Sequence, residues 1–282
     1  MVNRGKLYIV ATPIGNLQDM TLRAIHVLKS VDLILAEDTR HCARLLEHYQ
    51  ISTKTWALHN FNESAHVDKI LSRLMLGESF ALISDAGTPL ISDPGWLLVS
   101  MARKMGLEVI AIPGPCALIA ALSIVGLPTQ KFQFFGFPPA KSAARQKVLK
   151  EIVHYTGTSI FYESPHRIIE MLTDCSDILG QERIYGLAKE LTKIFETVRT
   201  GSCAELLAWL KEKPEHVKGE FVVFVGPSEL SSDTELLSAQ ALLRMMLPYM
   251  PLKVAVKIVA EHCHVNKNSV YDFALSVSSE SL

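Results

Sequence analysis

The sequence predicts an α/β fold, with two α/β domains followed by a small C-terminal helical unit. Short apolar runs rich in Val and Ile alternate with segments of helical periodicity, as in sheets with helical crossovers. Three of these runs end in turns rich in Gly and Pro, the residues that most often end a strand or begin a helix. Beyond Gly226 and Pro227 the alternation stops and only helical patterns follow.

The first predicted domain spans residues 1–127. Its strands are expected at Leu7–Ala11, Leu33–Glu37, Thr55–His59, Phe80–Ser84 and Val109–Ile112. Its helices are expected at Thr21–Lys29, Thr39–Gln50, Ser64–Leu76, Trp96–Met105 and Cys116–Val125. The uncharged stretch Val109–Thr129 is long enough to cross a membrane, but Pro113-Gly114-Pro115 interrupts it. We therefore expect a buried strand and helix there, and no membrane association.

The second predicted domain spans residues 128–228, and the helical unit spans residues 234–282. Strands are expected at Phe132–Phe137, Ser159–Tyr162, Ile184–Ala188 and Phe221–Val225, and helices at Lys141–His154, His166–Leu179 and Cys203–Lys211. A polar link, Ser228–Asp233, precedes three short helices at Leu236–Leu247, Leu252–His262 and Ser269–Ser276. The last two resemble a helix-turn-helix, and a packing or dimerisation appendage is the alternative.

The composition narrows the possible functions. The chain has 282 residues, 49% hydrophobic and 20% charged, with a formal net charge of −1, which argues against a generally basic nucleic-acid binder. Five scattered cysteines form no CxxC pair, so we expect neither a zinc site nor disulfides, and a reducing cytoplasm fits best. The tripeptide His262-Cys263-His264 lacks further ligands at a recognisable spacing, so no metal is expected.

The loops that follow three predicted strands suggest a ligand site. They are Ala11–Leu17, Ser84–Gly95 and Pro113–Ala117, all rich in Gly or Pro and all without Lys or Arg. Loops at the carboxyl ends of strands bind ligands in open α/β sheets, and a phosphate loop commonly adds a basic residue. The ligand is therefore expected to carry hydroxyls or positive charge. For each loop, an ordinary strand-to-helix turn is the alternative.

Ionisable residues also follow predicted strands, in the segments Glu37–Arg40, Glu163–Arg167 and Lys189–Lys193. A shared crevice would bring them together, although helix capping explains several of them equally well. The helix Lys141–Lys150 carries four cations and follows several phenylalanines, a combination that suits single-stranded RNA. A solvated helix face over core phenylalanines is the alternative.

Seven motifs occur together and in order: Thr12–Leu17, Ala36–Arg40, Ser84–Pro89, Pro113–Pro115, Phe161–Arg167, Ala188–Lys193 and Lys218–Glu220. Through these motifs the chain resembles the tetrapyrrole methylase superfamily. Within it, the resemblance is to the branch that methylates the 2'-hydroxyl of a cytidine in small-subunit ribosomal RNA. The match covers nearly the whole chain, and residue 116 departs from it, because a small residue such as Ser is expected where Cys116 stands.

The resemblance implies S-adenosylmethionine bound in a cleft between two α/β domains, a cytoplasmic homodimer, and a cytidine in the decoding region as target. The RNA partner is naked 16S ribosomal RNA or the assembled small subunit. Residues at positions that surround the cofactor in this family are Pro13, Gly15, Asp85, Ala86, Gly87, Thr88, Pro89, Ser92, Pro113, Gly114, Pro115, Ala117, Tyr162, Ala188, Gly219 and Glu220.

Methylation of a ribose hydroxyl calls for alignment and for a base or a charge that stabilises the developing alkoxide. Asp38, Glu163 and Glu190 are the candidate bases, and Lys189 and Arg40 are candidates to hold a phosphate or the alkoxide. The expected RNA contacts are Lys141, Arg145, Lys147 and Arg167. A small-molecule methyltransferase acting on a tetrapyrrole and a non-catalytic RNA-binding protein are the alternatives.

Overall fold

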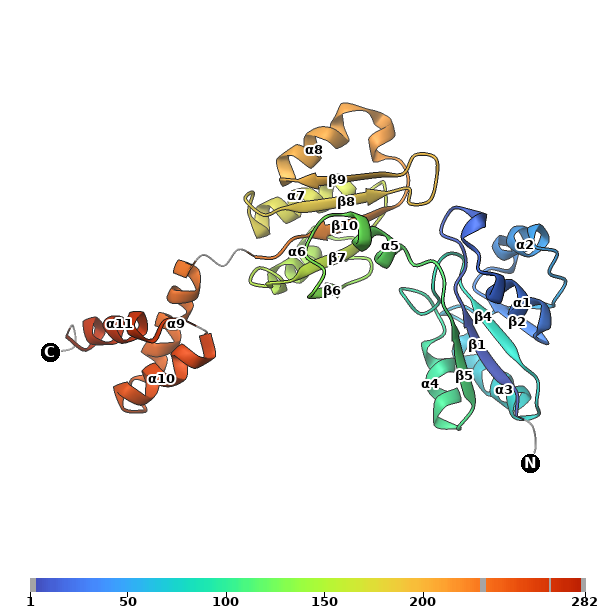
Figure 1. Ribbon diagram of the computed structural model, residues 1–282, viewed down its shortest axis with the longest axis horizontal. Coiled ribbons are helices and arrows are strands. Elements are labelled where there is room, and N and C mark those ends of the chain that lie inside the picture. The colour runs from blue at the N-terminus through green and yellow to red at the C-terminus, as the bar shows by residue number, and fades with distance from the viewer. Residues whose placement is uncertain (1–3, 229–231, 264, 280–282) are drawn as a thin grey trace. The chain divides into compact units, whose positions relative to one another are not determined.

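The computed structural model describes residues 4–228, 232–263 and 265–279 (Figure 1). The chain forms a larger unit that ends at Gly226 and a smaller unit made of residues 153–156 and 227–282. The larger unit contains two five-stranded sheets, one in each predicted α/β domain. The α/β fold class and the C-terminal helices are confirmed.

The first sheet is parallel, in the order β3-β2-β4-β1-β5. Its strands are β1 (Lys6–Val10), β2 (Leu33–Ala36), β3 (Thr55–Ala57), β4 (Phe80–Ile83) and β5 (Glu108–Ile112). Helices α1 (Leu22–Ser30) and α2 (Thr39–His48) pack on one face, and α3 (Glu63–Met75) and α4 (Trp96–Lys104) pack on the other.

The neighbouring strands β1 and β4 lead to opposite faces of this sheet. The chain leaves β1 through the short 3-10 helix η1 (Leu17–Asp19) for α1, and it leaves β4 for α4. Such a reversal opens a crevice at the carboxyl ends of the two strands, where α/β sheets bind their ligands. The topology therefore favours the loops after β1 and β4 as the place for a ligand site.

The second sheet is mixed, in the order β6-β7-β10-β8-β9. Only β6 and β7 pair in parallel, and the other neighbours pair antiparallel. Its strands are β6 (Phe132–Phe134), β7 (Thr158–Glu163), β8 (Tyr185–Lys189), β9 (Thr197–Gly201) and β10 (Phe221–Val225). Its helices are α6 (Ser142–Glu151), α7 (Ile168–Leu179) and α8 (Cys203–Glu212), with the 3-10 helix η2 (Pro214–Val217) after α8.

Two features of the larger unit differ from the predictions. Strand β9 was not predicted, because it is a partly exposed edge strand of sequence TVRTG with no apolar run. Helix α5 (Ala117–Ile124) was assigned to the first domain, yet its Leu118, Ala121 and Leu122 pack in the core of the second sheet. The chain therefore passes to the second core before α5, earlier than the predicted boundary at residue 127.

The smaller unit is a three-helix cluster of α9 (Ser232–Met246), α10 (Leu252–Cys263) and α11 (Lys267–Ser279). Its core is formed by side chains of all three helices, including Leu243, Val256 and Val270. Residues 229–231 of the predicted polar link and His264 lie outside the described residues. In the part of the chain that the structure describes, no helix is long and apolar enough to span a membrane.

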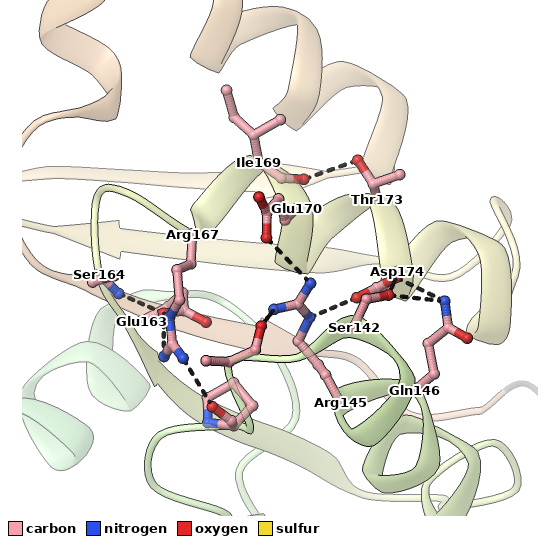
Figure 2. Close-up of polar contacts among 12 residues, drawn as sticks. Ser142, Arg145, Gln146, Glu163, Ser164, Arg167, Ile169, Glu170, Thr173 and Asp174 are labelled. Carbon is pink, nitrogen blue, oxygen red and sulfur yellow. Dashed lines mark hydrogen bonds and ion pairs between the residues drawn. The ribbon is translucent and has the colours of Figure 1, made fainter.

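A buried ionic network joins α6 to α7 (Figure 2). Arg145 is only 1% exposed, and its Nε donates to Asp174 Oδ2 at 2.6 Å. Ser142 Oγ and Gln146 Nε2 donate to the other Asp174 oxygen, each at 2.8 Å. Arg145 was predicted to contact RNA, but its guanidinium is enclosed by the protein. Its role is to tie the two helices together, because burial and pairing leave it no free surface for a phosphate.

Removing the Asp174 carboxylate should destabilise the larger unit strongly. In Asp174→Ala the buried Arg145 charge loses its partner, and the expected loss is about 3–5 kcal/mol of unfolding free energy. Urea denaturation followed by circular dichroism measures this loss. The control is Lys147→Ala, because Lys147 lies exposed on the same helix. Equal stability of the parent and Asp174→Ala would contradict this account of the network.

Candidate functional site

A cavity of about 500 Å³ lies at the carboxyl ends of β1 and β4, walled on its other side by residues of the second sheet. The loop after β4 supplies Asp85 to Thr88 and Ile91 to Asp93. The second sheet supplies residues at the ends of β7 and β10, among them Tyr162, Glu163 and Phe221. The cavity therefore forms where both halves of the larger unit contribute loops.

The loops after β1 and β4 are joined by a pair of backbone hydrogen bonds. Thr12 N donates to Gly87 O at 2.8 Å, and Gly87 N donates to Thr12 O at 3.0 Å. Gly87 adopts a φ of +83°, a left-handed conformation that favours glycine. Thr88 Oγ1 donates to Pro115 O at 2.9 Å, which ties in the loop after β5. The three loops predicted to form one crevice are therefore linked directly.

Tyr162 joins the second sheet to the start of α5. Leu118 N donates to the Tyr162 hydroxyl oxygen at 3.0 Å, and burial raises the pKa of Tyr162 above its ordinary value. The rings of Phe134 and Phe137 contact Tyr162 edge-on, with centroids 4.8 and 5.6 Å away. This aromatic group forms an apolar wall of the cavity.

Three carboxylates stand close together on the opposite wall: Glu37, Asp85 and Asp93. Burial, and then the charge of Asp85, raise the pKa of Glu37. Burial raises the pKa of Asp93 to about 6, with the charges of Glu37 and Asp85 adding to the effect and a hydrogen bond with Ser84 opposing it. Among the described residues, no Lys, Arg or His lines the cavity. A cationic or hydroxyl-bearing ligand would relieve this crowding of negative charge.

Asp38 and Arg40 do not line this cavity. Asp38 caps α2 by accepting a hydrogen bond from Arg40 N at 2.8 Å, and the Arg40 guanidinium holds the pKa of that carboxyl well below its usual range. The contacts of Asp38 are therefore those of a helix cap, which was the alternative to a catalytic role. Its low pKa makes this carboxylate a weak proton acceptor.

Glu190 and Lys189 also have protein partners. Burial opposes ionisation of Glu190, but hydrogen bonds from Lys193 Nζ and Glu220 N outweigh it, so the pKa of Glu190 lies below its ordinary value. Lys189 is 5% exposed and its Nζ donates to the carbonyl oxygens of Glu215 and His216. Burial lowers the pKa of Lys189. Neither residue lines the cavity, so neither is placed to act on a ligand there.

Glu163 lines the cavity, and its side chain is 0% exposed. Its Oε1 accepts hydrogen bonds from Ser164 N at 2.7 Å and Arg167 Nε at 2.8 Å (Figure 2). Arg167, a predicted RNA contact, is thus engaged by a buried carboxylate. The contacts occupy Glu163 Oε1, whereas Oε2 is buried without a hydrogen-bond partner among the described residues.

The structure brings about half of the predicted cofactor residues to the cavity. Asp85, Ala86, Gly87, Thr88, Ser92, Ala117, Tyr162 and Glu220 line it. The residues Pro13, Gly15, Pro89, Pro113, Gly114, Pro115, Ala188 and Gly219 do not line it and flank its loops instead.

Sequence reasoning missed Glu37, Asp93 and Phe137 as lining residues. Glu37 directly precedes Asp38 at the end of the same strand. The sequence therefore predicted the correct segment, but Asp38 was taken as the candidate base in place of Glu37. Asp93 lies in the loop Ser84–Gly95, which was predicted to bind a ligand. It was not chosen because it lies ten residues after β4, whereas the candidate bases were taken from the ends of strands. For Phe137, a strand was expected to run to this residue, whereas β6 ends at Phe134.

Comparisons with known proteins agree with this architecture. A family model described as Tetrapyrrole (Corrin/Porphyrin) Methylases matches residues 6–207, and one described as RsmI C-terminal HTH domain matches residues 233–278. Among solved structures, uroporphyrin-III-C-methyltransferase from Thermus thermophilus is 19% identical with a TM-score of 0.55, over 79% of this chain and 94% of that one. A cobalt precorrin-4 methyltransferase is 14% identical with a TM-score of 0.57, over 78% and 94%. These two show a shared fold.

Curated relatives are much closer in sequence. Proteins named ribosomal RNA small subunit methyltransferase I are 50% identical in Vibrio cholerae, over 95% of this chain and 94% of the relative, and 46% identical in Escherichia coli O157:H7, over 97% and 96%. The Pseudomonas aeruginosa protein of that name is 47% identical over 99% of this chain and 100% of the relative. This chain therefore belongs to the tetrapyrrole methylase superfamily and, within it, to the family of ribosomal RNA small subunit methyltransferase I.

Proposed function

We propose that this chain transfers a methyl group from S-adenosylmethionine to the 2'-hydroxyl of a cytidine in small-subunit ribosomal RNA. The observation that supports the proposal most directly is the cavity at the carboxyl ends of β1 and β4. Among the described residues, five acidic residues line this cavity and no Lys or Arg does. The names of the curated relatives, which match along nearly their whole lengths, support ribosomal RNA as the substrate. Work on ribosomal RNA also fits the expected cytoplasmic location.

The residues of the cavity fit S-adenosylmethionine. This cofactor has a sulfonium, a ribose diol and an ammonium group but no phosphate, so carboxylates suit it and cations are not needed. The backbone at Gly87 lies open to a ligand, since a Cβ there would meet only Ile14 Cγ2 at 3.4 Å and Pro115 O at 3.9 Å. The cofactor supplies an electrophilic methyl group when bound. Asp85, Gly87 and Thr88 are the residues proposed to hold it.

The proton of the ribose hydroxyl is proposed to pass to the Glu37 and Asp93 carboxylates. Both line the cavity, and both have a raised pKa, which makes them stronger bases than an ordinary carboxylate. Of the carboxylates expected from the sequence, Asp38 and Glu190 have lowered pKa values, and Glu163 is paired with Arg167 through Oε1. The pair at the cavity is therefore the better assignment.

The RNA is proposed to bind through exposed cations of the second α/β domain. Three exposed lysines lie along α6: Lys141 at its N-cap, Lys147 within it and Lys150 in its last turn. The small ribosomal subunit or its RNA would supply the phosphates, and a homodimer is the proposed assembly, as the family resemblance implies. The C-terminal helices, which match a helix-turn-helix model, are proposed to add to RNA binding.

A tetrapyrrole as substrate is not favoured. The solved methyltransferases of that kind are 14–19% identical to this chain, a level at which the likeness extends to the fold alone. The relatives at 46–50% identity carry the ribosomal RNA name and span the C-terminal helices as well.

Gly87→Val should abolish tight binding of S-adenosylmethionine. A β-branched side chain at a φ of +83° is strained, so the loop after β4 has to move. Calorimetry with S-adenosylmethionine should show affinity at least about tenfold weaker, equivalent to about 1.4 kcal/mol. Gly180→Val is the control, because Gly180 has a φ of +88° and lies outside the cavity lining. Parental affinity in a folded Gly87→Val protein would refute the cofactor assignment.

Glu37→Gln and Asp93→Asn should each slow methyl transfer roughly 100-fold or more under single-turnover conditions, with smaller effects on binding. Because the base acts in its ionised form, the parental rate should fall as pH drops below about 6, the raised pKa of Asp93. Asp38→Asn and Glu190→Gln are the comparison variants, and near-parental rates are expected for them. Near-parental rates in Glu37→Gln and Asp93→Asn would assign catalysis to alignment and electrostatics alone.

Replacing Lys141, Lys147 and Lys150 with Gln should weaken RNA binding and flatten its salt dependence. Each lost phosphate contact reduces the slope of log affinity against log salt by about 0.7–0.9. Filter binding to small-subunit RNA at several salt concentrations measures the slope. The control removes the same charge from the exposed residues Lys29, Lys54 and Lys104 of the first domain. If both triple variants have the parental slope, α6 is a solvated face only.

A further inference from the structure

We propose that Phe137 is the platform on which the base of the target nucleotide stacks, and that Glu163 and Arg167 are positioning residues for this ring. The inference rests on the proposed function, because it names a contact with the RNA substrate at the same site. In this proposal, stacking of the base on the Phe137 ring places the ribose of the target nucleotide over the cavity.

Phe137 is an exposed aromatic residue of the cavity lining. Its side chain lines the cavity, and yet the residue is 59% exposed. The other aromatic residues of the lining, Tyr162 and Phe221, are half-buried and buried respectively. The exposed Phe137 ring at the cavity therefore has a free aromatic face beside the proposed site of reaction. Aromatic rings of this kind stack on unpaired bases in RNA recognition.

The backbone on both sides of Phe137 is fixed. Tyr162 N donates to Gly136 O at 2.9 Å, and Arg167 NH1 donates to Pro138 O at 3.2 Å. Gly136 has a φ of +66°, and a Cβ there would lie 3.1 Å from Ser92 Oγ in the loop after β4. The ring is therefore held next to the loop that is proposed to bind the cofactor.

Arg167 can hold Pro138 because Glu163 holds Arg167. The fully buried Glu163 carboxylate accepts from Arg167 Nε at 2.8 Å and pairs with its NH2 at 2.7 Å (Figure 2). Both contacts go to Glu163 Oε1, so two nitrogens of the guanidinium are held at one buried carboxylate oxygen. The pair of Glu163 and Arg167 therefore sets the position of the Phe137 segment through the Pro138 carbonyl.

The exposure of Phe137 favours the RNA over the cofactor as its partner. Methyl transfer needs the reacting atoms to be shielded from water. A small molecule within a cavity of about 500 Å³ does not cover a ring that projects into solvent, whereas a flipped-out nucleotide joined to a polymer does. Once stacked, the base would place its own ribose toward Glu37 and Asp93.

The test measures kcat/KM for methyl transfer to unmethylated small ribosomal subunits, alongside calorimetry with S-adenosylmethionine. Phe137→Leu keeps an apolar side chain and removes the stacking face, so kcat/KM should fall about 5-fold to 150-fold, the range expected for one stacked base. Phe137→Trp should stay within about threefold of the parent, since it keeps that face. Phe132→Leu is the matched control, because Phe132 is 41% exposed in the same segment and does not line the cavity. Affinity for S-adenosylmethionine should be unchanged in all three.

The positioning role is tested by epistasis. Arg167→Met should lower kcat/KM on its own, but the double variant Phe137→Leu with Arg167→Met should be no slower than Phe137→Leu alone. An additional loss in the double variant would show that Arg167 acts independently of the ring.

Parental kcat/KM in Phe137→Leu overturns the inference, and so does an equal loss of S-adenosylmethionine affinity, which would place the cofactor on the ring. If the parent itself methylates no small subunits, the proposed function fails, and that outcome is distinct from an active parent with an unaffected variant.

Discussion

The backbone bridge between Thr12 and Gly87 is the interaction on which the site depends. Strands β1 and β4 lie side by side but send their chains to opposite faces of the sheet, so their loops would diverge without a link. Two backbone hydrogen bonds close that gap, and they require the left-handed conformation that Gly87 adopts. Because backbone atoms form the bridge, the side chains of Asp85 and Thr88 take no part in it. Asp85 Oδ1 accepts from Asp38 N, Thr88 Oγ1 donates to Pro115 O, and both residues line the cavity.

The charged residues at the strand ends fall into two groups with different chemistry. Asp38, Glu163 and Glu190 each have a cation within the chain, at Arg40, Arg167 and Lys193 respectively. Pairing of this kind fixes the geometry of all three carboxylates, and it helps to lower the pKa of Asp38 and of Glu190. Glu37 and Asp93 crowd against Asp85 instead, and their raised pKa values follow from burial and like charge. Groups left in this state are typical of sites that act on a ligand.

The sequence predicted most elements of both sheets to within a few residues, because apolar runs and helical periodicity reflect burial directly. It failed where burial is weak or where packing crosses a domain boundary. Strand β9 is held by its ladder to β8 and has little apolar character of its own. Helix α5 is apolar on all sides, so its sequence does not specify which sheet it covers, and only tertiary packing against Ile160 and Phe224 decides that.

The candidate site was likewise predicted only as far as local sequence properties allow. Loop composition located the cavity, since Gly, Pro and the absence of cations are local properties of the loops after β1, β4 and β5. Choosing among carboxylates needed the partners of each one, and those partners come from contacts such as Arg167 with Glu163. Arg145 is the clearest case: a helix with four cations predicts an RNA surface, yet this cation faces Asp174 in the protein interior. Sequence identifies which groups can carry charge, and packing decides which of them retain a free face for a ligand.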